Sequence, residues 1–190
     1  AKAVQAVIAE VSRLAGQMSA RDVGQLLNAF ANLAEGGLHV DVEHVRAVNN
    51  ETIRVAGRAT AADVSIIVRA FARLAESGID VDNAKALRAV SAQMKRLTGE
   101  MFAGEMKHRD APQILLAFAQ LVGLGQDVDA KEVRAVIAEA ARVAGDMRAK
   151  EVSATLLAMG RLAASGMNVL DAKDVRAVSA QTARVAGTMS

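Results

Sequence analysis

The 190-residue sequence contains no cysteine, no tryptophan and no tyrosine, and it has only one proline and four phenylalanines. Without cysteine there is no disulfide framework and no thiolate nucleophile or metal ligand. So few aromatic rings also disfavour recognition of bases by stacking. Lys and Arg number 23 against 21 Asp and Glu, so net charge does not direct the chain toward nucleic acid or a membrane.

Signals of membrane insertion and catalysis are also missing from the sequence. No apolar run approaches the roughly 18–20 residues of a membrane span, so we expect no membrane association. The phosphate-loop, serine-hydrolase and zinc-protease motifs do not occur. His39, His44 and His108 are scattered and lie in no dense set of carboxylates. We therefore expect no enzyme, no catalytic residue, no metal site and no cofactor.

What the sequence does contain is a tandem repeat. The stretch RAVIAEAARVAG at Arg134–Gly145 recurs from Arg46, Arg88 and Arg176, and a degenerate copy starts at Gln5. Such periodicity indicates a repeat architecture, in which each unit contacts its neighbours. The expected repeats are 5–45, 46–87, 88–133, 134–175 and a half repeat 176–190.

Each repeat also carries a second segment that begins at an acidic residue, as in DVGQLLNAFANLAEGG from Asp22. Its apolar residues fall on one face of a helix. Capping boxes at Ser19–Asp22 and Thr60–Asp63 predict where this helix starts. Glycines predict its end; they are Gly37, Gly78, Gly125 and Gly166. Other glycines predict the end of the first helix; they are Gly16, Gly57, Gly99, Gly145 and Gly187.

Three further sets of residues recur at fixed positions of the repeat; we call the residues at one repeat position a column. The sequence predicts N-caps at Asp41, Asp82, Asp129 and Asp171. It predicts buried linker residues at Val40, Val81, Val128 and Val169. It predicts a core column at Phe30, Phe71, Phe118 and Met159. The fold class is therefore expected to be all-α, an α-solenoid of stacked antiparallel hairpins with about nine helices, four hairpins and a closing helix.

Two irregularities interrupt the repeat. The third repeat has extra residues around GEMFAGEM at 99–106, which should lengthen a turn and display Met101 and Phe102. Pro112 is compatible with a helix only in its first turn, so that helix should start at Asp110. The chain also stops at Ser190, where its next helix should begin, and we expect a fragment of a longer array. Exposed apolar stripes at both ends would favour end-to-end self-association.

Arginine columns are the most distinct surface feature. One column is a candidate partner-binding ladder, because regularly spaced guanidinium groups can bind an acidic peptide or phosphates; it comprises Arg46, Arg88, Arg134 and Arg176. A second column lies in the last helical turn with Glu or Gln three residues earlier, which favours a structural role; it comprises Arg13, Arg54, Arg96, Arg142 and Arg184.

Variable positions on the outer face of the second helices are the other candidates for partner binding. A repeat protein can vary such positions on a constant frame to recognise a ligand, although surface drift gives the same variation. The polar candidates are Asn28, Asn32, Arg69, Arg73, Gln120 and Arg161.

The second-helix cores LLNAFANLAEGG and ILLAFAQLVGLG resemble the short core motif of two repeat classes. One is the octotricopeptide type, a family that binds RNA in organelles. The other is the roughly 42-residue SKWP-type repeat of type III effectors from plant-pathogenic bacteria, whose period is closer to this one. HEAT-like stacking is a third, generic likeness. The resemblance implies a right-handed helical superhelix and, for the effector class, a bacterial protein secreted into a host cell.

Two functions follow as hypotheses. The first is a non-enzymatic scaffold that binds a protein partner along its repeats, within a larger bacterial effector-like protein. The alternative is an RNA-binding repeat protein whose arginine ladders contact phosphates. The sequence names neither the partner nor the compartment.

Overall fold

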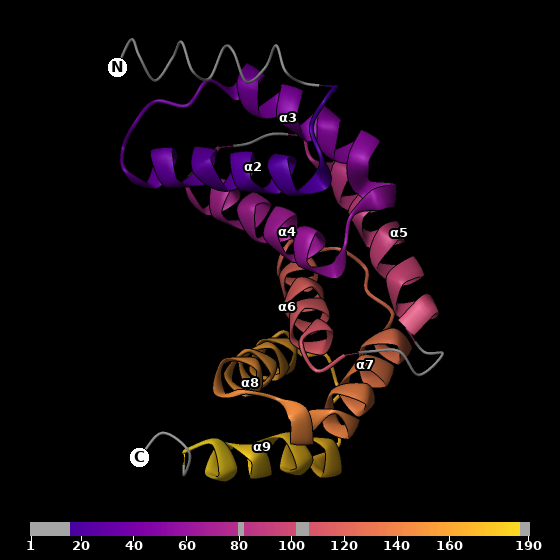
Figure 1. The fold of residues 1–190 in the computed structure, drawn as a ribbon. Helices are drawn as coiled ribbons and strands as arrows, with labels where there is room; N and C mark the ends of the chain where they lie inside the picture. Colours follow the sequence, from indigo (N-terminus) through magenta and orange to yellow (C-terminus); the bar gives the residue numbers. More distant parts are fainter. Residues whose placement is uncertain (1–15, 80–81, 102–106, 187–190) are drawn as a thin grey trace. The chain divides into compact units, whose positions relative to one another are not determined.

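The computed structural model describes residues 16–79, 82–101 and 107–186. Within these ranges the chain is all-α and has no strand, so the predicted fold class is confirmed at this level (Figure 1). The α-helices are α2 (Ala20–Glu35), α3 (Val42–Val55), α4 (Ala61–Glu76), α5 (Ala84–Met101), α6 (Asp110–Gly123), α7 (Ala130–Arg142), α8 (Ala149–Ala164) and α9 (Ala172–Ala186). Two short 3₁₀ helices, η1 (Ala56–Arg58) and η2 (Ala144–Asp146), follow α3 and α7. The ninth expected helix, before Gly16, lies outside the described residues, as does the loop at 102–106.

The chain divides into two compact units, residues 1–93 and 94–190, with the boundary inside α5. In the first unit α2 packs against α4 and α3 (Figure 1). In the second unit α6 packs against α8 and α7, and α9 packs against α7 and α8. Within each unit, therefore, the second helices of adjacent repeats contact each other side by side.

Helix ends agree with the sequence in most places. Ser19 and Thr60 form complete capping boxes with Asp22 and Asp63. The glycines predicted to end the second helices adopt positive φ, as at Gly37 with φ +73°, a conformation that side-chain-bearing residues rarely adopt. Of those predicted to end the first helices, Gly16 does so too, whereas Gly57 and Gly145 lie within η1 and η2. The predicted aspartate caps each accept a bond from the backbone N–H two residues on; they are Asp41, Asp82, Asp129 and Asp171.

One helix end was predicted incorrectly. The first helix of the third repeat was expected to stop at Gly99, but α5 continues through Gly99 to Met101. The extra residues of this repeat follow directly, so the chain is not required to turn at the glycine. The expected start of the next helix is confirmed, since α6 begins at Asp110 with Pro112 in its first turn.

The core is built from the predicted columns. The aromatic column is at most 2% exposed and comprises Phe30, Phe71, Phe118 and Met159. The linker valines Val40, Val128 and Val169 are buried, while Val81 lies outside the described residues. The buried face of α2 is wider than predicted, because Gly24 and Ala31 are also buried. A Cβ at Gly24 would lie 3.0 Å from Ile66 Cγ2, so this glycine lets α2 and α4 approach closely.

Candidate functional site

A hollow of about 220 Å³ opens beside Arg46 in the first unit. We call it the first hollow; its lining residues are Arg46, Asn49, Asn50, Ile53, Asp82 and Lys85. The α3 side chains lie about one helical turn apart, while Asp82 precedes α5 and Lys85 lies in its first turn, near the end of the same repeat. Asn49 Nδ2 donates to the Asp82 carbonyl at 2.9 Å, which joins α3 to the residues that lead into α5.

A hollow at the corresponding place in the second unit has a volume of about 360 Å³. This second hollow is lined by Arg134, Ala138, Asn168, Val169, Leu170, Asp171 and Asp174. Arg134 occupies the repeat position of Arg46, and its guanidinium donates to the Asn168 carbonyl at 2.9 Å. Two aspartates line this hollow, whereas the first has one aspartate and two cations.

The candidate arginine column thus has two members beside hollows and two on open surface. Arg46 forms an ion pair with Glu43, and both side chains are largely exposed. Arg88 and Arg176 are exposed and make no hydrogen bond or ion pair with any described residue. The structure describes each of these arginines within its own unit, so a continuous ladder along the chain stays a prediction.

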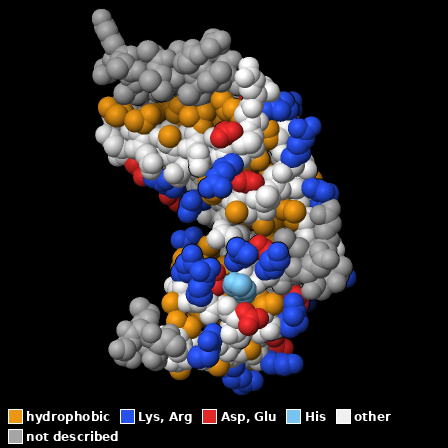
Figure 2. All heavy atoms as spheres, viewed as in Figure 1, with side chains coloured by type: hydrophobic (Ala, Val, Ile, Leu, Met, Phe, Trp, Pro, Cys, Tyr) orange, Lys and Arg blue, Asp and Glu red, His pale blue; other side chains and the backbone are white. Residues whose placement is uncertain are grey.

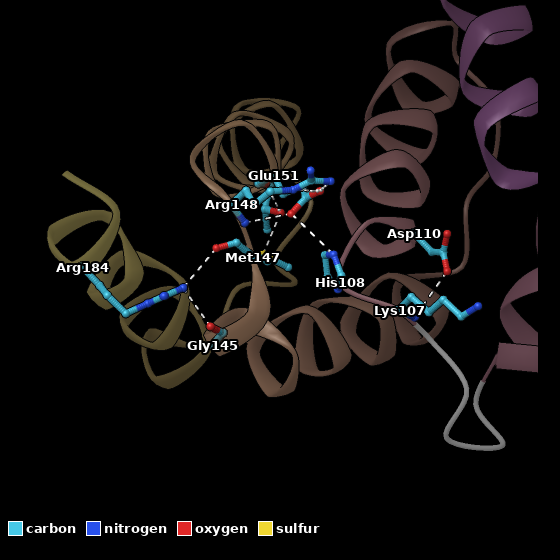
Figure 3. Close-up of polar contacts among 9 residues, drawn as sticks. Lys107, His108, Asp110, Gly145, Met147, Arg148, Glu151 and Arg184 are labelled. Carbon is cyan, nitrogen blue, oxygen red and sulfur yellow. Dashed lines mark hydrogen bonds and ion pairs between the residues drawn. The ribbon is translucent and has the colours of Figure 1, made fainter. Parts of the chain in front are cut away.

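The second arginine column joins consecutive repeats through main-chain carbonyls. Arg54 contacts Glu51 at 2.6 Å and donates to the Met18 carbonyl at 2.8 Å. Arg184 repeats this arrangement with donations to Gly145 at 2.8 Å and Met147 at 3.1 Å (Figure 3). These bonds occupy turn carbonyls of the preceding repeat, which is what a structural role requires.

The other members of this column vary in their contacts. Arg142 pairs with Glu139 on its own helix. Arg96 is also engaged. Gln93, three residues before it, donates to the Ala59 carbonyl at 2.7 Å and so takes the role that Arg54 has in the preceding repeat. Arg13 lies outside the described residues.

Buried Glu51 explains why Arg54 is held in place. Hydrogen bonding from the Arg54 side chain lowers the pKa of Glu51, against the opposing effect of burial, and a bond from the Gly16 main chain adds to the lowering. Glu51 is only 8% exposed, but because these bonds outweigh the effect of burial on its pKa, its carboxylate stays ionised within the packing between two repeats. An ionised buried group needs such partners to offset lost hydration.

Three of the second-helix candidates bind one another. Arg73 of α4 donates to Asn28 at 2.5 Å and to Asn32 at 2.6 Å, both on α2. Its Nε also donates to Glu35 at 2.8 Å, and this bond lowers the pKa of Glu35. We call this set, Asn28, Asn32, Glu35 and Arg73, the arginine clamp. Its groups satisfy each other across two adjacent helices.

The remaining second-helix candidates are not brought together in this way. Arg69 and Arg161 are exposed and have no hydrogen-bond or ion-pair partner among the described residues. Gln120 is half-buried, and its Oε1 has no partner in the described part of the chain. Leu157 of α8, near this face, is 52% exposed.

A polar cluster at the start of α8 was not predicted from the sequence. Glu151 Oε2 accepts from the Arg148 main chain at 2.8 Å and lies 3.9 Å from His108 Nε2 (Figure 3). Burial raises the pKa of Glu151, but the bonds from Arg148 outweigh it, so the net shift is downward. The Glu sits three residues after Arg148, as in a capping box, and this spacing was the available signal.

Sequence reasoning also missed the role of Asn49 and Lys85. A signal was present, because Asn49 occupies the repeat position of the buried Ile137, and a polar residue at an apolar position demands a partner. Among the described residues, no three His, Asp or Glu side chains gather as metal ligands. None of the helices in the described ranges combines the length and apolar character of a membrane span.

Comparison with models of known protein families, with curated proteins and with solved structures gives no match to this chain.

Proposed function

We propose that the chain is a non-enzymatic repeat scaffold, an α-solenoid of stacked hairpins, that binds a polypeptide partner on the surface lined by its first helices. The observation that supports this proposal most is the recurrence of a hollow beside the same repeat arginine, Arg46 and Arg134, in both units. The frame around each arginine is constant, while the other lining residues differ in charge and size. Variation on a constant frame is how repeat proteins acquire partner specificity.

The mixture of charges favours a polypeptide over RNA. A groove for RNA would present cations along the phosphates without interspersed carboxylates. Here Asp82 lines the first hollow, and Asp171 and Asp174 line the second. On the face shown in Figure 2, blue Lys and Arg side chains are interspersed with red Asp and Glu side chains and with neutral surface. Such a surface suits a partner that itself carries both charges and apolar groups.

Selection from a displayed library of random peptides, followed by affinity measurement, tests the proposal. Peptides selected on the chain should bind Arg46→Glu or Arg134→Glu at least about tenfold more weakly, since inverting a charge at an interface costs 1.4 kcal/mol or more. Arg58→Glu is the control, because Arg58 is exposed and lines neither hollow.

A binding measurement with RNA distinguishes the proposed function from the RNA-binding alternative. Binding of a mixed-sequence oligoribonucleotide should be weak and should vanish as salt rises, with no dependence on the hollows. The proposal is overturned if specific RNA binding survives physiological salt and is lost in the combined variant of Arg46, Arg88, Arg134 and Arg176.

A further inference from the structure

Resting on the proposed function, we propose that the first hollow binds an acidic segment of a partner peptide. In this mode the ligand carboxylate contacts Arg46 and Lys85, and an adjacent main-chain N–H of the ligand donates to Asn49 Oδ1. The inference assigns a ligand chemistry to one hollow and excludes the other, whose lining is richer in carboxylates.

The first argument comes from Asn49, whose side-chain oxygen accepts no hydrogen bond from any described residue. Its side chain is buried, with the residue 4% exposed, and its Nδ2 donates to the Asp82 carbonyl. A carbonyl cannot donate, so this bond fixes the carboxamide orientation and leaves Oδ1 as the free atom. That oxygen has no hydrogen-bond partner in the described part of the chain. Buried acceptors are normally satisfied, so a group that lines a hollow and lacks a donor points to a ligand N–H.

Charge is the second argument. Lys85 is exposed and makes no ion pair with a described residue. Arg46 pairs with Glu43, but their side chains are 53% and 71% exposed, and exposed pairs are readily exchanged for a better partner. The guanidinium keeps further N–H donors that Glu43 does not use. Two cations beside one unpartnered acceptor match a carboxylate next to a peptide N–H.

Apolar contact favours a peptide over a phosphate ligand. Ile53 lines the same hollow and is 40% exposed, which provides a surface for an aliphatic side chain of the ligand. Asp82 lines it too and would repel a chain of phosphates more than a single carboxylate. The hollow therefore suits an acidic residue beside an aliphatic one.

Titration of the ¹⁵N-labelled chain with three blocked peptides tests this assignment. The probes are acetyl-GLEGLEG-amide, the same peptide with Lys in place of Glu, and the Glu peptide methylated on the main-chain nitrogens of its Glu and Leu residues. The Glu peptide should shift the Asn49 side-chain amide resonances and the Arg46 Nε resonance. The Lys peptide should leave both in place. Methylation removes the N–H donors without changing the protein, and it should weaken binding about fivefold, the value of one hydrogen bond.

Charge inversion in the protein provides the matched control. Arg46→Glu with Lys85→Glu should weaken the Glu peptide at least about tenfold and make the Lys peptide the better ligand. Lys173→Glu should change neither, because Lys173 is exposed, takes the place of Lys85 in the register of α9 and does not line the second hollow.

The outcomes separate this inference from the function on which it rests. The inference is wrong if none of the probes binds, if methylation has no effect, or if the Glu peptide still shifts the Asn49 amide resonances in the double charge inversion. If peptides from the displayed library still bind the chain in those cases, the scaffold function stands without this site. Both proposals are wrong if the mixed-sequence oligoribonucleotide alone shifts the Asn49 and Arg46 resonances and does so with a steep dependence on salt.

Discussion

The contact of α2 with α4 and the contact of α6 with α8 join equivalent helices of successive repeats, which carry different side chains at the same repeat positions. In the first unit Arg73 is bound by Asn28, Asn32 and Glu35 of the preceding repeat. In the second unit an arginine recurs at the same repeat position, Arg161, but the positions of Asn28, Asn32 and Glu35 are taken by Leu116, Gln120 and Gly123. One arginine is therefore part of the packing, whereas the side chain of the other has no partner among the residues that the structure describes.

The two hollows differ in a parallel way. The first combines Arg46 and Lys85 with a buried amide, whereas the second combines Arg134 with two aspartates. Arg134 is partly engaged by the Asn168 carbonyl. Position in the repeat therefore does not define what an arginine does; the groups that surround it do.

The largest expected effect tests how tightly the first unit is packed. Gly24→Leu should destabilise the chain by about 2–3 kcal/mol, because the new side chain has to displace Ile66 and Ile67 at the α2–α4 contact. Gly160→Leu is the control, since a Cβ at Gly160 meets nothing within 4 Å. It should stabilise the chain by about 0.5–1 kcal/mol through helix propensity. Urea unfolding of both variants measures these changes in the free energy of unfolding. Equal effects of the two substitutions would contradict a close approach of α2 and α4 at Gly24.

The next comparison sets Arg73→Ala against Arg161→Ala. Loss of the two amide hydrogen bonds at Arg73 should lower the free energy of unfolding by about 1 kcal/mol. Arg161→Ala should change it by less than about 0.5 kcal/mol, as expected for an exposed side chain that contacts no partner in the described ranges. Similar losses in the two variants would contradict the difference between the units.

A smaller effect is expected from acid. The bond from Arg73 lowers the folded pKa of Glu35 below its unfolded value of about 4.3. The Arg73–Glu35 bond therefore contributes its full stability above that pH and loses it as the pH falls through the lowered folded value. In urea titrations between about pH 5 and pH 3, Glu35→Gln should flatten the decline in midpoint. Asp127→Asn, at an exposed residue without a described partner, should leave the decline unchanged.

Local features of this fold could be predicted from the sequence, while contacts between repeats could not. The capping box of Thr60 and the core position of Phe118 depend on spacing within one helix, which the sequence shows directly. The pairing of Arg73 with Asn28 depends on which residues of adjacent helices face each other. Without that lateral register, Arg73 and Asn28 were treated as separate partner-binding candidates, although they bind each other. The first hollow was missed for a similar reason, since Asn49 lies on α3 and Lys85 on α5, and the sequence does not show which residues of the two helices meet.

The lateral register can be tested by building the arginine clamp into the second unit. Leu116→Asn, Gln120→Asn and Gly123→Glu place the α2 side chains at the corresponding repeat positions of α6, the helix that packs against α8. The free energy of unfolding should change little. The new bonds to Arg161 are offset because asparagine is a weaker helix former and because the burial of Leu116 is lost. The coupling between Arg161 and the new side chains is the informative quantity. A double-mutant cycle with Arg161→Ala should give about 0.5–1 kcal/mol, against none in the parent chain. If the coupling energy stays at zero, the two helix pairs differ in geometry as well as in side chains. The lack of a partner for Arg161 among the described residues would then result from the position of the α8 backbone relative to α6.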